Sequence, residues 1–282
     1  MRLSLRTRQP QVSLSTGRFG QRFWPLFLIG LLGVATLPLI IMPMISAGTI
    51  SEGLPDLSLP VLVSLSLINP VLFLTVGVAL GAWLTPRLGL FSLIVNWRIN
   101  GDSVWPHLRS VAPRAILLGV AFALATVLLD AFLEPLFSVE WLEAAGEAGE
   151  PGGAGPLIAG LLYGGITEEL MLRWGMLSLV AWIVWRLGQR AEGPPSGAVL
   201  WVAIVVAALL FGAGHLPAVA TLAPLDAVLV LRTIGLNALG GLLFGYLFCR
   251  YHLEAAMLAH ASAHIGFAII AWAGLLVTAA AP

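Results

Sequence analysis

Two adjacent carboxylates and an arginine stand inside an apolar stretch of this sequence, the segment YGGITEELMLRWG from Tyr163 to Gly175. On insertion scales a charged side chain at the centre of a membrane-spanning helix costs about 3 kcal/mol, and such residues usually serve a function. Glu169 and Arg173 are four residues apart, so they share a helix face and can pair. Glu168 points about 100° away around the helix. We therefore expect Glu168 to stay free to act as a general base toward water.

Imidazoles follow in two later segments. FGAGH places Phe211 and His215 four residues apart, so the phenyl ring can wall a pocket that holds the imidazole. HASAH places His260 and His264 one turn apart on one helix face, with small residues between them. Together with Glu168, these groups can activate a water molecule and stabilise an oxyanion. The same four side chains can equally hold Zn²⁺, so a metal-dependent and a metal-free site both stay open.

These segments resemble the motifs of a known family. EELMLR fits Glu-Glu-x-x-x-Arg, and FGAGH fits Phe-x-x-x-His. GGLLFGYLFCRYHLEAAMLAHASAH fits a glycine-rich helix, a short turn, a leucine and His-x-x-x-Asn or Asp. This is the pattern of the CAAX-prenyl protease type II and bacteriocin-processing proteases, the CPBP or Abi family of multi-helix intramembrane endopeptidases. The resemblance covers residues 156–270, and the three motifs in this order are specific only together.

The resemblance implies a role for each matching residue. Glu168 would activate the attacking water together with His215. Glu169 and Arg173 would support that site.

The resemblance also implies that His260 and His264 stabilise the oxyanion. His264 stands where the family usually has Asn or Asp; an imidazole can still donate a hydrogen bond, and it adds metal affinity. Leu172 replaces the aromatic residue that often precedes the motif arginine. The departure at His264 keeps a second hypothesis open, a catalytically silent member of this fold that serves as a membrane scaffold or regulator.

The composition predicts an integral membrane protein. Of the 282 residues, 59% are hydrophobic and 10% are charged, whereas soluble domains usually carry about 25% charged residues. The formal net charge is zero, so no basic field attracts nucleic acid, and we expect no nucleic-acid partner. The single cysteine, Cys249, excludes an intramolecular disulfide and is interpreted as an apolar filler.

Seven apolar runs are long enough to span a bilayer. They cover residues 24–46, 60–84, 113–133, 156–187, 197–215, 226–249 and 254–278. Apolar segments in lipid must be helical, because a helix satisfies its own backbone hydrogen bonds. The sequence thus predicts an all-α, polytopic membrane bundle. The segment 88–112, with Trp97, Arg98 and Trp105, is expected to hold an interfacial helix.

Arginine outside the spans occurs only in the N-terminal tail and in the second, fourth and sixth connections. Positive charge marks the cytoplasmic side, so we expect the N-terminus inside and the C-terminus outside, in a prokaryotic plasma membrane. Residues 1–23 are expected to form a cytoplasmic tail, and residues 24–282 a single membrane domain with a catalytic core at 156–270. The acidic, Gly-rich stretch from Glu140 to Pro156 predicts a flexible outer loop.

Depth along the spans conflicts with a shared site. Counted from the inner face, His260 lies about 6 residues deep, whereas Glu168 lies about 19 and His215 about 18 residues deep. Straight helices would not bring these groups together. We therefore expect a broken or tilted fourth helix near Gly164, with Thr167 capping a helix that begins at the first glutamate.

The sequence favours an intramembrane endopeptidase that hydrolyses a peptide bond of a membrane-anchored peptide, a prenylated or otherwise lipidated C-terminus, or a leader peptide. Its cofactor stays open between none and Zn²⁺, and its partners are the substrate and the lipid bilayer. A metal-ion transporter is a further alternative, although no inverted repeat is visible. Arg232 and Asn237 are interpreted as links between helices, and His252 and Glu254 as solvated residues of an inner turn. Close helix packing is expected at the glycines of one run, Gly235, Gly240, Gly241 and Gly245.

Overall fold

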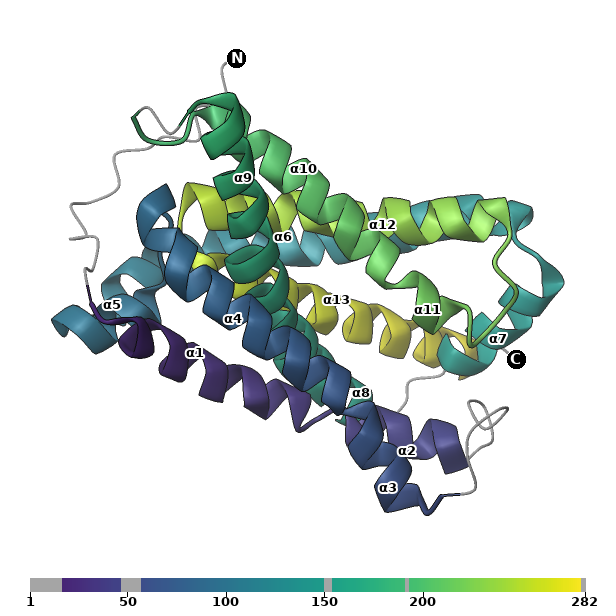
Figure 1. The fold of residues 1–282 in the computed structure, drawn as a ribbon. Helices are drawn as coiled ribbons and strands as arrows, with labels where there is room; N and C mark the ends of the chain where they lie inside the picture. Colours follow the sequence, from purple (N-terminus) through teal and green to yellow (C-terminus); the bar gives the residue numbers. More distant parts are fainter. Residues whose placement is uncertain (1–16, 47–56, 150–153, 191–192, 280–282) are drawn as a thin grey trace.

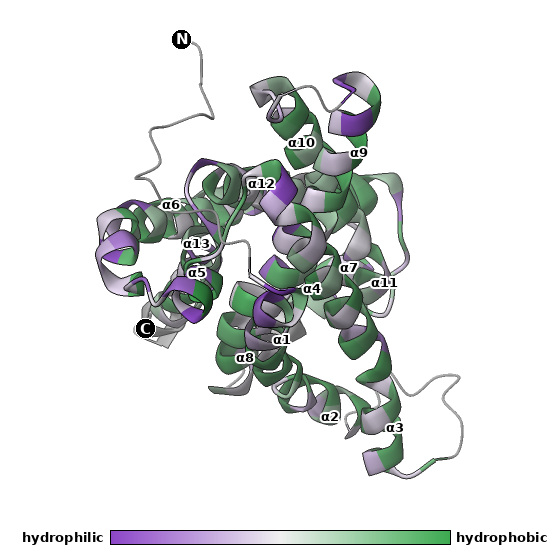
Figure 2. Cartoon of the chain, turned by 60° about the vertical axis from the view of Figure 1, so that its left-hand side comes forward, coloured by the Kyte–Doolittle hydropathy of each residue, from purple (hydrophilic) through white to green (hydrophobic). Residues whose placement is uncertain are grey.

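A computed structural model describes residues 17–46, 57–149, 154–190 and 193–279, and within these ranges helices are the only regular secondary structure. Seven helical segments are long and apolar enough to cross a membrane. They are Phe19–Ser46, Leu59–Leu88, Val104–Leu136, Ala154–Gly188, Gly197–Val219, Ala227–Arg250 and Leu253–Gly274. Figure 2 shows hydrophobic residues along all these helices. The predicted all-α membrane bundle is thereby confirmed, and the protein is an integral membrane protein.

Five of the seven spans are made of consecutive shorter helices, and short helices also lie between spans. In chain order the first half contains α1 (Phe19–Val34), α2 (Pro38–Ser46), α3 (Leu59–Ser66), α4 (Ile68–Leu88), α5 (Leu93–Asn100), α6 (Val104–Leu133), η1 (Glu134–Leu136) and α7 (Val139–Gly149). The second half contains α8 (Ala154–Ala159), η2 (Gly160–Glu168), η3 (Leu170–Leu177), α9 (Ser178–Gly188), α10 (Gly197–Gly214), α11 (Leu216–Val219), α12 (Ala227–Arg250) and α13 (Leu253–Ala279).

The fourth span lies inside the bundle. Figure 1 shows α6, α12 and α13 running alongside one another, while α4 and the fourth span cross them obliquely. η2 packs against α1 and α13, and η3 packs against α4 and α10. The segment that carries the glutamates is therefore enclosed by helices from both halves of the chain.

The fourth span is neither broken nor capped at Thr167, which corrects that part of our expectation, whereas its oblique course (Figure 1) agrees with the tilted alternative. η2 and η3 are π-helices, a rare form with i to i+5 hydrogen bonds that is often found at functional sites. The Thr167 hydroxyl donates a hydrogen bond of 2.8 Å to the carbonyl of Gly30 in α1. A Cβ at Gly33 would collide with Thr167 and Leu162, so α1 approaches this wide helix closely.

The turn between α12 and α13 is buried, so our expectation of a solvated turn is wrong. His252 is 4% exposed and Glu254 is 7% exposed. Glu254 accepts hydrogen bonds from the Ser92 hydroxyl at 2.5 Å and from the amides of Leu93 and Ile94 at 2.9 and 3.0 Å. Because α13 begins beneath the connection from α4 to α5, a depth count from its first residue understates how far His260 lies inside the protein.

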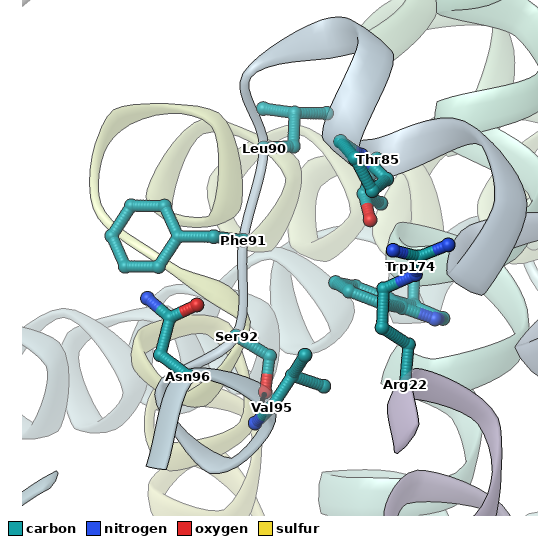
Figure 3. Close-up of a pocket in the computed structure, with 9 residues that line it drawn as sticks. Arg22, Thr85, Leu90, Phe91, Ser92, Val95, Asn96 and Trp174 are labelled. Carbon is teal, nitrogen blue, oxygen red and sulfur yellow. Dashed lines mark hydrogen bonds between the residues drawn. The ribbon is translucent and has the colours of Figure 1, made fainter. Parts of the chain in front are cut away.

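That connection is short and lies against the bundle. Figure 3 shows Leu90, Phe91 and Ser92 in extended backbone between the end of α4 and the start of α5, close to a pocket lined by Arg22 and Trp174. Gly89 ends α4 in the left-handed region, with a φ of 71°, which glycine adopts without strain. The chain can therefore reverse directly into the segment that covers α13.

Glycines at helix crossings let backbones approach, as the sequence predicts for most of them. A Cβ at Gly241 of α12 would lie 2.6 Å from Ala208 of α10, and one at Gly119 of α6 would collide with Ala259 of α13. Gly235 is an exception, because a Cβ there would meet no atom within 4 Å. The interpretation of Gly235 as a close-packing position is therefore wrong.

Three boundaries also differ from the prediction. Residues 139–149 form α7 instead of a flexible loop, because Trp141 is buried in a small apolar cluster with Ala223 and Leu229. Only Leu93–Asn100 of the segment 88–112 forms a separate helix, since α6 already begins at Val104. The N-terminal tail ends earlier, because α1 starts at Phe19; its residues 1–16 lie outside the described residues, as do residues 150–153.

Truncating Glu254 should destabilise the protein. The Glu254→Ala variant leaves a buried hydroxyl and two backbone amides without their acceptor, and each buried donor left unpaired costs about 1–3 kcal/mol. Thermal unfolding in detergent should show a clearly lowered Tm. Glu140→Ala, at an exposed position of α7, serves as the matched control. A Tm equal to that of the wild type for both variants would contradict the anchoring role.

Candidate active site

The carboxylate and the imidazoles predicted from the three motifs line one cavity of about 220 Å³. Glu168 comes from the end of η2, His215 from the end of α10, and His260 and His264 from α13. α6 and α12 complete the wall of this cavity. The structure thus brings these four side chains together, whereas straight spans would have kept them apart.

Glu169 is held on two sides. Its side chain is fully buried, and its Oε1 lies 2.9 Å from Arg173 Nη1 and 2.8 Å from His260 Nδ1. A carboxylate oxygen accepts hydrogen bonds, so His260 Nδ1 carries the hydrogen. The neutral His260 ring then presents the lone pair of Nε2, which lies 4.0 Å from Glu168 Oε2.

The Arg173 guanidinium is also buried between aromatic rings. Its Cζ lies 4.9 Å from the centroid of Phe211 and 5.3 Å from that of Phe244. Ring faces attract a cation, and more so when water is excluded. Phe244 is in turn stacked on His260 with ring centroids 4.6 Å apart. Arg173 and its carboxylate partner therefore form part of the wall behind the cavity.

His215 has a defined tautomer. Its Nδ1 lies 2.9 Å from the Phe211 carbonyl oxygen, and because a carbonyl only accepts, Nδ1 carries the hydrogen. Nε2 of the neutral ring is left as an acceptor. The Phe211 ring packs edge-on against the imidazole at 4.7 Å, which is the arrangement that the Phe-x-x-x-His spacing predicts.

His264 stacks on His260, with ring centroids 5.1 Å apart, and lies against η2. A Cβ at Gly160 would lie 2.6 Å from His264 Nδ1, and one at Gly164 would collide with His264 Nε2. Gly160 and Gly164 thus make room for this ring. From the sequence we expected Gly164 only to bend the fourth helix, although the spacing Gly-x-x-x-Gly indicates close approach of helices.

Two residues that line the cavity were not predicted as site residues. From the sequence we assigned no role to Thr126 and interpreted Asn237 as a link between helices. Thr126 of α6 lines the cavity, although every candidate site residue predicted from the sequence lies after the first three spans. Asn237 of α12 also lines it, and its Nδ2 donates to the Thr233 carbonyl at 2.8 Å. Since this bond stays within α12, the structure does not show Asn237 linking helices. The signal for both residues was a polar side chain inside an apolar span.

Arg232 does link helices, as we interpret it from the sequence. Its Nε and Nη2 donate to the two carboxylate oxygens of Asp130 in α6 at 2.6 and 2.5 Å. The guanidinium also lies 4.7 Å from the Trp141 ring centroid. The bidentate pair joins α12 to α6 at one edge of the cavity.

The candidate metal ligands do not fit a metal ion in this arrangement. Throughout the described ranges, no group of three or more His, Cys, Asp or Glu side chains is placed to hold one. The ring nitrogens of His264, one of the four candidates, lie against η2. The chemistry below is therefore assigned to side chains and water alone.

One family model matches the segment that carries most of the site. Residues 151–266 match the family described as type II CAAX prenyl endopeptidase Rce1-like. This segment is thus similar to the protease domain of the CPBP family. The match contains all three motifs and confirms the resemblance read from the sequence. Members of this CPBP group are membrane endopeptidases, in agreement with the predicted class. Comparisons with curated proteins and with solved structures found no match.

The two adjacent glutamates should differ in their effect on stability. Glu169→Ala leaves the Arg173 charge buried without its carboxylate, and breaking a buried ion pair in this way costs about 3–5 kcal/mol. Thermal unfolding in detergent should therefore show a large loss of Tm. Glu168→Ala is the matched control and should keep a Tm near that of the wild type, because this side chain faces the cavity. Equal losses for both variants would contradict the assignment.

Proposed function

We propose that this protein is an intramembrane endopeptidase that hydrolyses a peptide bond of a membrane-anchored, lipidated peptide or protein. The observation that carries the proposal is the different environment of the two glutamates. Glu169 is occupied by Arg173 and His260, whereas Glu168 faces the cavity. Glu168 Oε2 lies 4.0 Å from His260 Nε2, and a carboxylate beside an imidazole acceptor is suited to general-base catalysis.

In the proposed step, a water molecule in the cavity lies between Glu168 and the scissile carbonyl carbon. Glu168 takes one proton from the water as its oxygen bonds to that carbon, and the electron pair of the C=O bond moves to the carbonyl oxygen. His215 Nε2 accepts the other water hydrogen and orients the molecule. When the intermediate collapses, the C–N bond breaks and the proton on Glu168 passes to the leaving amine. The products are a carboxylic acid and an amine.

His260 has a narrower role than the family resemblance implies. Its Nδ1–H is directed to Glu169, so in the neutral ring Nε2 can only accept. It can donate to an oxyanion only as an imidazolium. We therefore place His260 beside Glu168 as an acceptor for water or for the reacting amine in its neutral form.

An apolar groove beside the cavity supports a lipidated substrate. It has a volume of about 450 Å³ and lies between α6 and α12, with Leu129, Leu133 and Leu239 in its wall. Leu236 and Arg232 line both the groove and the cavity. A hydrocarbon chain in the groove would bring the attached peptide to the carboxylate.

The proposal includes a topology. The alternation of arginine along the sequence favours the N-terminus in the cytoplasm and the C-terminus outside, in the plasma membrane of a prokaryote. Residues 24–282 would form a single membrane domain, with residues 156–270 as its catalytic core.

Replacing the general base should abolish cleavage. Glu168→Gln and His215→Ala, in liposomes with a panel of farnesylated and acylated peptides, should lower kcat/KM by about 10²-fold or more. Mass spectrometry of the products measures this, and Glu140→Gln serves as the control at an exposed position. Retained activity in Glu168→Gln would refute the base assignment. A wild type that cleaves none of the peptides would favour a silent membrane scaffold.

A side chain that fills the groove should weaken the binding of the lipid chain of the substrate. A side chain at Gly235 enters open space, so Gly235→Leu should leave the fold intact and raise KM for a farnesylated peptide. KM for the same peptide without the lipid should stay unchanged. Gly274→Leu, also in open space, is the matched control. An equal effect on both peptides would argue against the groove as the lipid site.

A further inference from the structure

Hydrolysis of a peptide bond develops negative charge on the carbonyl oxygen, and a preorganised N–H or O–H donor must stabilise that charge. The neutral imidazoles in the cavity leave this need unmet. His215 and His260 each direct Nδ1–H to an acceptor behind the cavity, so their Nε2 atoms only accept. The ring nitrogens of His264 lie against Gly160 and Gly164 of η2. The donor must therefore come from another part of the wall.

Asn237 is the amide side chain that lines this cavity. Its Nδ2 donates one hydrogen to the Thr233 carbonyl at 2.8 Å, and the amide oxygen cannot take that place because two acceptors would face each other. The bond fixes the side-chain orientation. The second hydrogen of Nδ2 is left over, since this bond uses only one of the two.

The position of Asn237 on α12 places it beside the reacting groups. Phe244, seven residues later on the same helix face, stacks on His260 at 4.6 Å. Gly240 lies between them on this face and also lines the cavity. The face of α12 that carries Asn237 is therefore the face that contacts the imidazole beside Glu168.

α6 supplies a second polar group to the same wall. Thr126 lines the cavity, and its Oγ1 is buried without a hydrogen-bond partner in the part of the chain that the structure describes. A buried hydroxyl without a partner is costly, so a substrate atom that binds here would satisfy it. Two neutral donors, one from each helix, thus line the same cavity as Glu168.

We propose that Asn237 is a catalytic residue whose free N–H donates a hydrogen bond to the oxyanion, with the Thr126 hydroxyl assisting it. The inference rests on the proposed endopeptidase function. As water oxygen bonds to the carbonyl carbon and Glu168 takes its proton, the C=O electron pair moves to the oxygen that accepts from Asn237. The pair returns to form C=O when the C–N bond breaks. Asn237 gains and loses no proton.

The test compares Asn237→Ala with the wild type in liposomes, using a farnesylated peptide as substrate. Loss of one oxyanion donor lowers kcat by about 10²–10³-fold, and KM should change little because the interaction is made in the transition state. A peptidyl phosphinate, which mimics the tetrahedral intermediate, should lose affinity for Asn237→Ala in parallel with kcat. The affinity of the uncleaved peptide for Glu168→Gln and for the Glu168→Gln/Asn237→Ala double variant should be equal.

Two further variants control for structural effects. In Asn237→Ser a short hydroxyl can still bond the Thr233 carbonyl within the helix, so the fold is kept while the donor no longer reaches the substrate; its kcat should fall like that of Asn237→Ala. Asn69→Ala, at an exposed position of α4, should behave as the wild type.

The outcomes separate this inference from the proposed function. An active wild type together with a kcat of Asn237→Ser within about twofold of it would overturn the role of Asn237 and leave the endopeptidase standing. Equal loss of affinity for phosphinate and for peptide would also overturn it, since that pattern indicates a binding or structural role. A wild type that cleaves no peptide would overturn the proposed function, and this role with it.

Discussion

The site depends on the contacts that the buried carboxylate of Glu169 makes with Arg173 and His260. One oxygen of this group lies within 2.9 Å of both Arg173, on its own helix, and His260, on α13. Removing either partner would leave a charge or a strong acceptor buried without compensation, which costs several kcal/mol. The pairing therefore fixes the fourth span against α13. It also occupies one glutamate of the adjacent pair and leaves Glu168 to the cavity.

A hydrogen-bond acceptor behind each of two imidazoles decides which ring nitrogen carries the hydrogen. Glu169 holds the hydrogen of His260 on Nδ1, and the Phe211 carbonyl does the same for His215, so Nε2 of each neutral ring is an acceptor. Such a site is rich in acceptors, which suits the removal of a proton from water. It has few hydrogen-bond donors for the oxyanion. The candidate donors are therefore the neutral side chains of Thr126 on α6 and Asn237 on α12.

Local patterns in the sequence predicted most of this architecture, and long-range contacts account for the errors. The seven spans and the Phe211–His215 contact follow from hydropathy and helical spacing. The burial of Glu254 does not, because its partners lie about 160 residues earlier in the chain. The π-helical winding of the fourth span was also missed. Thr126 stood in a span whose remaining residues gave no sign of a site.

A double-mutant cycle tests the central interaction most directly. The free energy of unfolding would be measured in detergent for the wild type, Glu169→Gln, His260→Ala and the double variant. Residues in direct contact couple by about 0.5–3 kcal/mol, whereas independent sites add within about 0.5 kcal/mol. We predict a coupling of at least about 1 kcal/mol. Additive effects would show that these two side chains act separately and would contradict the account.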